Sequence, residues 1–283
     1  MLNIKSHNIN TITLFLLLCL PFAAKTQSIY GVVSDSGNKP LPYVNIGIVG
    51  KNVGTVTDEN GEYVLLIDNS FINDTVRFSM VGHKPKSLLV SDIISKSNNK
   101  IDVILRHSTI ELAEVVVSAS KYKERNKGKK IILGLGNFGF GAGFNTDALG
   151  NEAGRKFTIK DKVLLSEFRF YIAKSTYDSL LFRMNIYSVK DNLPFENLLK
   201  NNVIINTDIK KGWVYMDLLE YDILAEEDII VTLEWIKDFK TKGTLTFGSS
   251  LGYPAYYRPA SQGKWSRFMM GGLAYAISMM VIE

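Results

Sequence analysis

Cysteine is almost absent from this sequence: its single copy, Cys19, lies inside an apolar run near the N-terminus. Residues 1–27 have the form of a secretory signal peptide, because a basic residue precedes that apolar run and small alanines follow it. Cleavage removes Cys19, which excludes a disulfide scaffold and a thiol enzyme. Acylation of Cys19 is the alternative, although Leu18 stands where a lipoprotein signal needs a small residue. We therefore expect an exported protein without disulfide bonds, which fits a bacterial envelope.

Histidine is nearly as scarce. His7 leaves with the signal peptide, so His83 and His107 remain. Neither has a histidine four residues away or a cysteine to complete a zinc site of the usual composition. No G-x-S-x-G motif supports a serine hydrolase. We therefore expect no metal, no cofactor and a non-catalytic protein.

Long apolar runs are missing after the signal peptide, where no segment approaches the ~20 residues of a membrane span. The formal charge of +5 is also local. One short segment accounts for all of it, through Lys121, Lys123, Arg125, Lys127, Lys129 and Lys130 against a single Glu124. We interpret this segment as a solvated linker. The alternative is contact with an anionic surface such as lipopolysaccharide, an acidic glycan or a partner's acidic face, whereas nucleic acid is not an expected partner of an exported protein.

Period-two alternation dominates the rest of the chain. Residues 28–119 contain about seven short apolar runs separated by turn residues such as Asp58-Glu-Asn-Gly61, which predicts a small antiparallel sandwich. Residues 151–283 alternate in the same way and predict a second, jelly-roll-like sandwich. Residues 120–150 form a basic and then glycine-rich linker. We therefore predict an all-β protein of two domains.

Three motifs in the first domain carry a family resemblance. They are Ile29-Tyr-Gly-Val-Val33, Pro40-Leu-Pro-Tyr-Val-Asn-Ile46 and Gly54-Thr-Val-Thr-Asp-Glu-Asn-Gly-Glu-Tyr63. Their order over about residues 28–106 resembles the carboxypeptidase regulatory-like domain, a transthyretin-like (Ig-like) β-sandwich of Gram-negative envelope proteins. The resemblance implies that Gly54, Asp58 and Gly61 shape turns, and it transfers no peptidase activity. It also implies a periplasmic or outer-membrane surface location.

Two further segments are similar to known neighbours of that domain. Glu111-Leu-Ala-Glu-Val-Val-Val-Ser-Ala119 is similar to the stretch that leads into the plug and barrel of outer-membrane receptors. Too few residues follow for a large barrel, so we expect none. Gly150-Asn-Glu-Ala-Gly-Arg155, Phe182-Arg-Met-Asn-Ile-Tyr187 and Leu233-Glu-Trp235 resemble an uncharacterised β-sandwich partner of the regulatory-like domain.

Two shorter patterns, at residues 134–139 and 194–200, depend on their neighbours for their interpretation. Gly134-Leu-Gly-Asn-Phe-Gly139 matches a dinucleotide fingerprint, but glycines follow where a helix is required, so we predict no nucleotide site. Pro194 before Phe-Glu-Asn-Leu-Leu predicts one short helix over residues 194–200.

An aromatic cluster near the C-terminus is the strongest candidate for a binding site. Aromatic faces bordered by hydrogen-bonding groups are typical of sugar platforms, and this cluster comprises Tyr253, Tyr256, Tyr257, Arg258, Gln262 and Trp265. The alternative is that these aromatics fill the core of the sandwich. We expect a binding or scaffolding module for a glycan or an envelope protein. The rival hypothesis is a hydrolase of envelope polysaccharide that uses carboxylates of the second domain, among them Glu167, Asp217 and Glu234. Asp217 and Glu234 alternate with apolar neighbours, which favours solvent-facing strand positions for both.

Overall fold

The structure is a computed structural model of the 283-residue chain. It describes residues 26–95, 98–108, 122–127, 149–237, 243–250, 252–269 and 271–282. Most of the expected signal peptide and of the glycine-rich linker lies outside these residues, and so do Lys121, Lys129 and Lys130. No helix among the described residues is long and apolar enough to cross a membrane.

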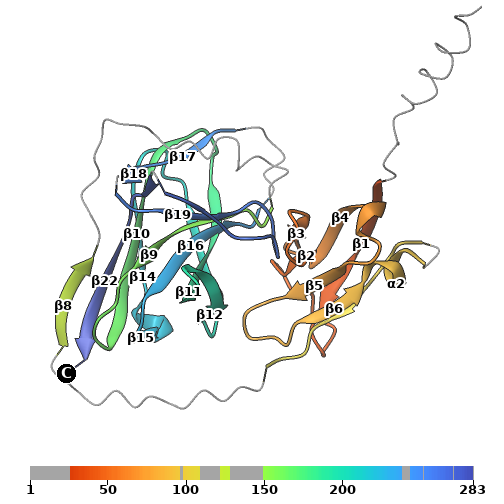
Figure 1. The fold of residues 1–283 in the computed structure, drawn as a ribbon, viewed down its shortest axis with the longest axis horizontal. Helices are drawn as coiled ribbons and strands as arrows, with labels where there is room; N and C mark the ends of the chain where they lie inside the picture. The colour runs from red at the N-terminus through yellow and green to blue at the C-terminus, as the bar shows by residue number, and fades with distance from the viewer. Residues whose placement is uncertain are drawn as a thin grey trace, which may run out of the picture.

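The N-terminal domain is a sandwich of two antiparallel-rich sheets (Figure 1). A three-stranded sheet has the order β4 (Glu62–Asp68), β1 (Thr26–Ser34) and β7 (Val103–Ile104). A four-stranded sheet has the order β3 (Gly54–Val56), β2 (Asn45–Ile48), β5 (Thr75–Ser79) and β6 (Lys86–Leu89). A 3₁₀ turn, η1 (Asn69–Phe71), and a short helix, α2 (Val90–Ile94), connect strands. The seven strands confirm the expected sandwich.

Its alternating residues build the core as the sequence pattern predicts. Ile46, Val76 and Phe78 are at most 1% exposed and pack with Ile29 and Val103 from the facing sheet. Alternate residues of each strand point to the same face, which is why one set is buried and the other is not.

The turn after β3 has the expected chemistry. The Asp58 carboxylate accepts hydrogen bonds from the backbone N–H groups of Asn60 and Glu62, both at 2.8 Å. Gly61 takes a φ of 73°, a conformation that a residue without a Cβ adopts freely. Gly54 differs, because it lies within strand β3 rather than in the turn.

The C-terminal domain is a larger sandwich of two facing sheets (Figure 1). The six-stranded sheet has the order β14 (Gly212–Asp217), β10 (Val163–Ser175), β22 (Tyr275–Ile282) and β8 (Tyr122–Lys127). Two short strands, β15 (Leu224–Ala225) and β17 (Leu245–Phe247), also pair with β10. The seven-stranded sheet has the order β12 (Leu193–Asn197), β11 (Leu180–Lys190), β16 (Ile229–Trp235), β9 (Glu152–Phe157), β19 (Ala255–Arg258) and β20 (Ser266–Phe268). Strand β13 (Val203–Thr207) also pairs with β11. A small pair, β18 (Ser249–Ser250) with β21 (Gly272–Leu273), and the 3₁₀ turn η3 (Leu219–Tyr221) complete the domain.

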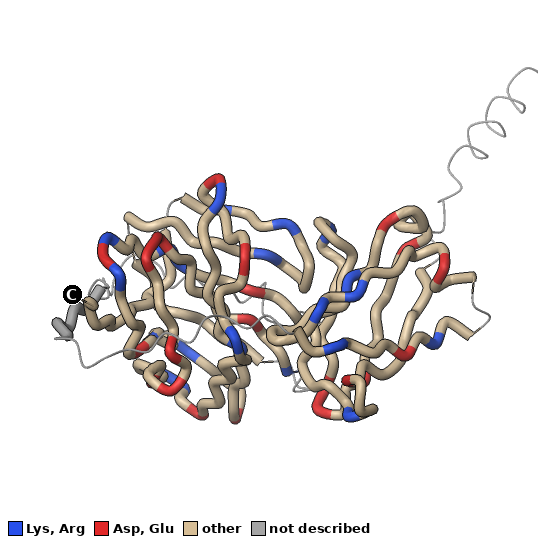
Figure 2. Tube along the Cα trace, turned by 90° about the horizontal axis from the view of Figure 1, so that it is seen from below, with Lys and Arg blue, Asp and Glu red and all other residues tan. Residues whose placement is uncertain are grey.

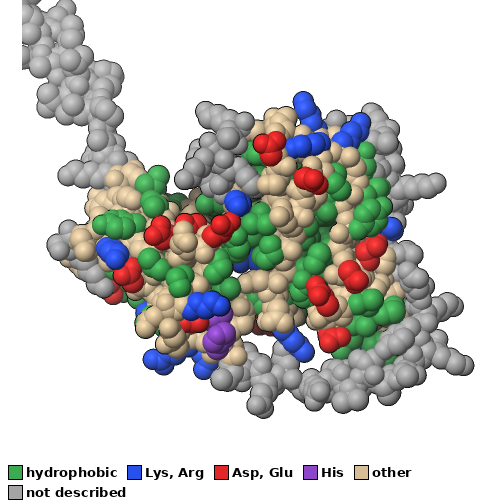
Figure 3. Space-filling view, turned by 180° about the vertical axis from the view of Figure 1, so that it is seen from behind, with side chains coloured by type: hydrophobic (Ala, Val, Ile, Leu, Met, Phe, Trp, Pro, Cys, Tyr) green, Lys and Arg blue, Asp and Glu red, His purple; other side chains and the backbone are tan. Residues whose placement is uncertain are grey.

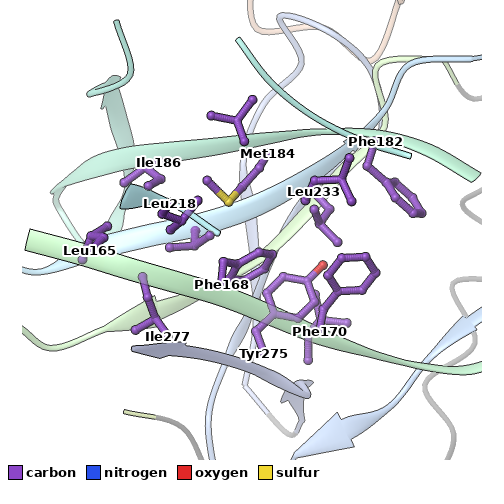
Figure 4. Packing of buried hydrophobic residues seen from close by; sticks show 14 of the residues in the cluster. Leu165, Phe168, Phe170, Phe182, Met184, Ile186, Leu218, Leu233, Tyr275 and Ile277 are labelled. Atoms are coloured by element: carbon purple, nitrogen blue, oxygen red, sulfur yellow. The ribbon is translucent and has the colours of Figure 1, made fainter. Parts of the chain in front are cut away.

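Aromatic side chains fill the space between these two sheets (Figure 4). Phe170 contacts the rings of Phe182, Phe247 and Tyr275 edge-on, with centroids 5.8–6.2 Å apart. Phe168, Met184 and Ile186 are fully buried around them, as the alternation along β10 and β11 predicts. Edge-to-face packing of this kind adds stability beyond the area that it buries.

Two further expectations differ from the structure. Residues 193–197 form strand β12 rather than the start of a helix, because Pro194 is tolerated on a strand at the edge of a sheet. Tyr122–Lys127, expected to be linker, forms strand β8 and pairs with β22 along its whole length, so this part of the basic segment belongs to the second sandwich (Figure 1). Over the other described residues, acidic and basic positions are interspersed in both domains (Figure 2).

Candidate functional site: a buried row of charges

Four charged residues form a row across four neighbouring strands of the seven-stranded sheet. In cross-strand register, Arg183 on β11 lies opposite Glu234 on β16, Glu234 opposite Glu152 on β9, and Glu152 opposite Arg258 on β19. Their exposed fractions are 1%, 0%, 0% and 8% in that order. The row reads positive, negative, negative, positive, so its charges balance. It lies on the face of the sheet opposite to the aromatic core, because Phe182, Met184 and Leu233 alternate with these residues.

Each carboxylate is held by one arginine. Arg183 donates from Nε and Nη2 to Glu234 Oε2, at 2.9 and 2.8 Å. Arg258 Nη2 lies 2.6 Å from Glu152 Oε2. Ion pairs buried this deeply are maintained when additional hydrogen bonds satisfy the remaining polar atoms.

Neutral polar side chains supply those additional bonds. Asn185 Nδ2 donates to both carboxylates, at 2.9 Å to Glu152 Oε1 and 3.0 Å to Glu234 Oε2. The Thr232 hydroxyl also donates to Glu152 Oε1, and the Tyr187 hydroxyl lies 3.4 Å from Glu152 Oε2. Asn197 on β12 donates at 2.9 Å to the Asn185 side-chain oxygen and fixes the orientation of that amide.

Burial changes the acidity of this cluster. Desolvation raises the pKa of Glu152 above its ordinary value, and the neighbouring Glu234 carboxylate acts in the same direction, while Arg258 opposes both. Burial also raises the pKa of the Tyr187 hydroxyl, an effect that Glu152 strengthens. The buried position of Glu152 therefore disfavours its charged form relative to a glutamate in water.

The N-terminal domain covers one end of the row. Arg183 Nη1 donates to the backbone carbonyl of Tyr43 at 2.6 Å, and Arg183 Nη2 donates to Asn45 Oδ1 at 2.7 Å. Ser261 Oγ donates to the same Asn45 oxygen at 2.8 Å. Arg183 thus binds Glu234 in its own domain and two residues of the other domain.

A loop of the second domain docks beside this contact. The carbonyl oxygen of Ser261 approaches the paired residues Gly47 and Gly54 so closely that a Cβ at either position would lie 2.1 or 2.3 Å from it. Gly50 N donates to the carbonyl of Gln262 at 2.9 Å, and Gln262 Nε2 donates to Ser79 Oγ at 2.8 Å. Gly54, expected to shape a turn, instead provides space for this loop.

Two more contacts join the domains. Val81 of the first domain packs against the apolar cluster of the second. At the exposed margin, Lys237 Nζ pairs with Glu59 Oε1 at 2.8 Å. The interface therefore combines an apolar contact, close backbone packing and a charged network.

The expected aromatic platform is divided between different environments. Tyr256 is 1% exposed and Arg258 is 8% exposed, so both belong to the interior, which fits the packing alternative. Trp265 is half-buried and covers Arg258, whose Cζ lies 4.9 Å from the indole centroid. Gln262 lies in the domain interface, and Tyr253 and Tyr257 are half-buried.

The three carboxylates of the hydrolase hypothesis do not converge. Glu167 and Asp217 are cross-strand partners on the six-stranded sheet, and Asp217 is exposed. Glu234 lies in the other sheet, where we expected a solvent-facing position, and it is fully buried. The expectation for Glu234 was wrong because every residue of β16 is buried, on both faces of the strand.

Sequence reasoning missed the other two members of the row, Glu152 near its centre and Arg183 at one end. The available signal was the composition of residues 229–235, which are apolar at nearly every position. A strand of this composition is typically covered on both faces. Such a strand places Glu234 in the interior and requires an arginine or lysine beside it.

The two histidines that follow the signal peptide lie together at the surface (Figure 3). His83 and His107 form an isolated β-bridge, and their ring centroids are 4.3 Å apart at an interplanar angle of 33°. No group of three or more potential metal ligands is present among the described residues.

The first domain matches a known protein family. Residues 29–117 match the family described as the CarboxypepD_reg-like domain, which confirms the resemblance in the sequence. The TonB-dependent receptor SusC of Bacteroides thetaiotaomicron is 30% identical over 94 residues, which cover 33% of this chain and 8% of the receptor. The matching part of this chain therefore spans less than a tenth of the receptor's length. The similarity supports an envelope-associated protein that carries a regulatory-like domain.

Solved structures add no further argument. The major pilin subunit BcpA of Bacillus cereus aligns with 88% of this chain and 69% of the pilin, at 10% identity and a TM-score of 0.19. A structure of infectious bursal disease virus aligns with 92% of this chain and 65% of the viral chain, at 9% identity and a TM-score of 0.21. Likenesses this low say nothing about the fold or the role of this chain.

Proposed function

We propose that this chain is a non-catalytic scaffold of the bacterial envelope, exported to the periplasm or the outer-membrane surface of a Gram-negative bacterium. Its two sandwiches act as one rigid unit that presents a binding surface to an envelope protein or a glycan. The regulatory-like domain and the similarity to part of an outer-membrane receptor support the envelope context.

The observation that carries the proposal is the position of Arg183. This side chain is 1% exposed and joins Glu234 of the second domain to Tyr43 and Asn45 of the first. Hydrogen bonds to a charged donor contribute more than neutral ones, and their directionality fixes orientation. A contact of this kind suits two domains that keep a constant relative position.

The hydrolase alternative is favoured by one observation, the proximity of two carboxylates with a raised pKa at Glu152. Several features argue against it. A glycosidase leaves ~5–9.5 Å between its carboxylates for the sugar and water. Here the Asn185 amide nitrogen lies within 3.0 Å of both carboxylates and occupies that space. Both carboxylates are also 0% exposed and paired with arginine.

A capture experiment tests the scaffold proposal. Tagged protein is incubated with envelope extract, with and without added envelope glycan, and compared with its Gly54→Ala and Gly37→Ala variants. We expect one defined partner to be retained by the wild type and by Gly37→Ala and to be lost from Gly54→Ala, whose domain interface is disturbed. Equal retention by all three proteins would contradict a role for the rigid unit.

An activity measurement tests the non-catalytic part. The purified protein is incubated with envelope polysaccharide and with peptidoglycan, and reducing ends are counted over time. We expect no release above the level of buffer. Release that disappears in both Glu152→Gln and Glu234→Gln would establish the hydrolase instead.

A further inference from the structure

A second buried arginine lies on the other face of the same sheet, away from the row of charges. Arg155 on β9 is 3% exposed and reaches across the sandwich, where its Nη1 donates to the carbonyl of Tyr275 on β22 at 3.0 Å. Its Nε is buried without a hydrogen-bond partner. This arginine therefore has unused donor capacity in the interior.

Arg155 also lacks a counter-charge. No aspartate or glutamate forms an ion pair with it among the residues that the structure describes. By contrast, Arg183 and Arg258, buried to a similar degree, each have a glutamate. Burial lowers the pKa of the Arg155 guanidinium, and Tyr253 is the group that opposes this effect. An isolated buried cation is costly unless an anion accompanies it.

Aromatic rings surround the guanidinium. Its Cζ lies 3.9 Å from the centroid of Tyr253 and 5.4 Å from that of Phe157. Tyr253 is half-buried, so the ring that covers the guanidinium is itself partly exposed to solvent. It follows the exposed Gly252, whose φ of 81° marks a turn at the surface. The covering ring is thus attached to a turn rather than to the middle of a strand.

A second unused polar group lies close by in the fold. Ser250 is 2% exposed and its Oγ has no hydrogen-bond partner. It is the cross-strand partner of Gly272, and a Cβ at Gly272 would lie 3.1 Å from the Cβ of Tyr253. Tyr253 therefore contacts Arg155 through its ring and lies next to the strand residue that pairs with Ser250.

We propose that Arg155 is the anchor of a carboxylate-binding site covered by Tyr253, and that the ligand is an acidic sugar residue or another small carboxylic acid. A guanidinium fork matches the two oxygens of a carboxylate. A monoanion balances the single cation, whereas a phosphate dianion would leave excess negative charge against the electron-rich faces of Tyr253 and Phe157. This site is separate from the domain interface, so it gives the proposed scaffold a ligand without depending on the scaffold role.

The test follows the Nε–H resonance of Arg155 by NMR in the full wild-type protein. The protein is titrated with sodium glucuronate, sodium acetate, sodium phosphate and glucose at constant ionic strength. We expect a saturable shift with glucuronate and acetate, none with glucose, and a weaker response to phosphate. Tighter binding of glucuronate than of acetate assigns the site to acidic sugars, and equal binding assigns it to small carboxylates in general.

Variants give the matched control. Arg169 on β10 also lies over an aromatic ring, that of Trp213, but it has Glu167 beside it and is partly exposed. We expect Arg155→Gln to lose the saturable response of the protein to glucuronate and Arg169→Gln to keep it. If Arg155→Gln does not fold, the wild-type titration decides alone. An Arg155 resonance that no carboxylate shifts, that shifts without saturation, or that responds most to phosphate would overturn the proposal.

Discussion

Arg183 makes contacts in both domains from a single side chain. Its guanidinium uses Nε and Nη2 for Glu234, Nη1 for the Tyr43 carbonyl and Nη2 again for Asn45. The fixed fork of arginine suits this arrangement, since lysine would offer one point of charge on a flexible stem. At the scale of single residues, we regard Arg183 as the principal contact between the sandwiches.

Replacement of this arginine tests its contribution to stability. Arg183→Met leaves Glu234 buried without its partner, which typically costs about 3–5 kcal/mol in the free energy of unfolding. Chemical denaturation of the wild type and the variant measures the difference. The control is Lys237→Ala, which removes an exposed pair at the edge of the same interface and should have little effect. Similar losses from both variants would contradict a special role for Arg183.

Glu152 predicts a particular dependence of stability on pH. Its pKa is raised in the folded state, so between its ordinary value of about 4.3 and the raised value the unfolded chain has released a proton that the folded chain keeps. The contribution of Glu152 to the free energy of unfolding therefore falls as the pH rises through this window. Glu152→Gln lacks this dependence on pH, because a glutamine side chain does not titrate. We expect the stability of the wild type relative to Glu152→Gln to decrease from acidic to neutral pH in denaturation experiments. A difference that is constant or increases with pH would contradict the assignment.

At the scale of elements, the β2–β3 hairpin is shaped to receive the loop that follows β19. The pair Gly47 and Gly54 leaves room for the Ser261 carbonyl, and Gly50 then hydrogen-bonds to Gln262. Backbone atoms meet directly here, so added side-chain volume has little space to move into.

A single methyl group tests this contact. Gly54→Ala places a Cβ 2.3 Å from the Ser261 oxygen, and we expect a loss of about 1–3 kcal/mol, as is typical of overpacking. Hydrogen exchange at the Gly50 amide, which donates to Gln262, should accelerate because the loop moves away. Gly37→Ala is the matched control, since the nearest atom to its Cβ is a side-chain oxygen at 3.3 Å. Unchanged protection of Gly50 in Gly54→Ala would show that the loop does not depend on this space.

The elements themselves were largely predictable from the sequence. Alternation such as that of Phe168, Phe170 and Ile172 identifies a strand and its buried face without further information. The helix expected at residues 194–200 failed because a proline near the start of a segment is as compatible with an edge strand as with a first helical turn. The strand β8 was missed because its basic composition has no apolar period, and its pairing partner β22 is far away in the sequence.

The site was much less predictable, for a physical reason. The row of charges exists because Arg183, Glu234, Glu152 and Arg258 share one register across four strands. Cross-strand register depends on pairing between distant segments, and a shift by one residue would turn each side chain to the other face. The sequence alone therefore could identify Arg258 as noteworthy but could not pair it with Glu152.

At the scale of the whole molecule, the charge row and the docked loop predict that two sandwiches behave as one body. The charged network has no net charge and is sealed from solvent, so it is only weakly screened by salt. Exposed contacts such as Glu59 with Lys237 are screened much more strongly. We therefore expect the relative position of the domains to be the same at low and at high ionic strength, as measured by small-angle X-ray scattering. A scattering profile that changes as salt is added would contradict this.

The distribution of distances between the domains tests the central claim most directly. The scarcity of cysteine makes the measurement simple: with Cys19→Ser, spin labels can be attached at Glu62→Cys in the first domain and Tyr215→Cys in the second, both exposed positions. Double electron–electron resonance then reports the distance between the two labels. We predict one narrow distribution for the otherwise wild-type protein and a broad one when Arg183→Met is added. A broad distribution in the otherwise wild-type protein would contradict the account of two sandwiches held together by the buried charges.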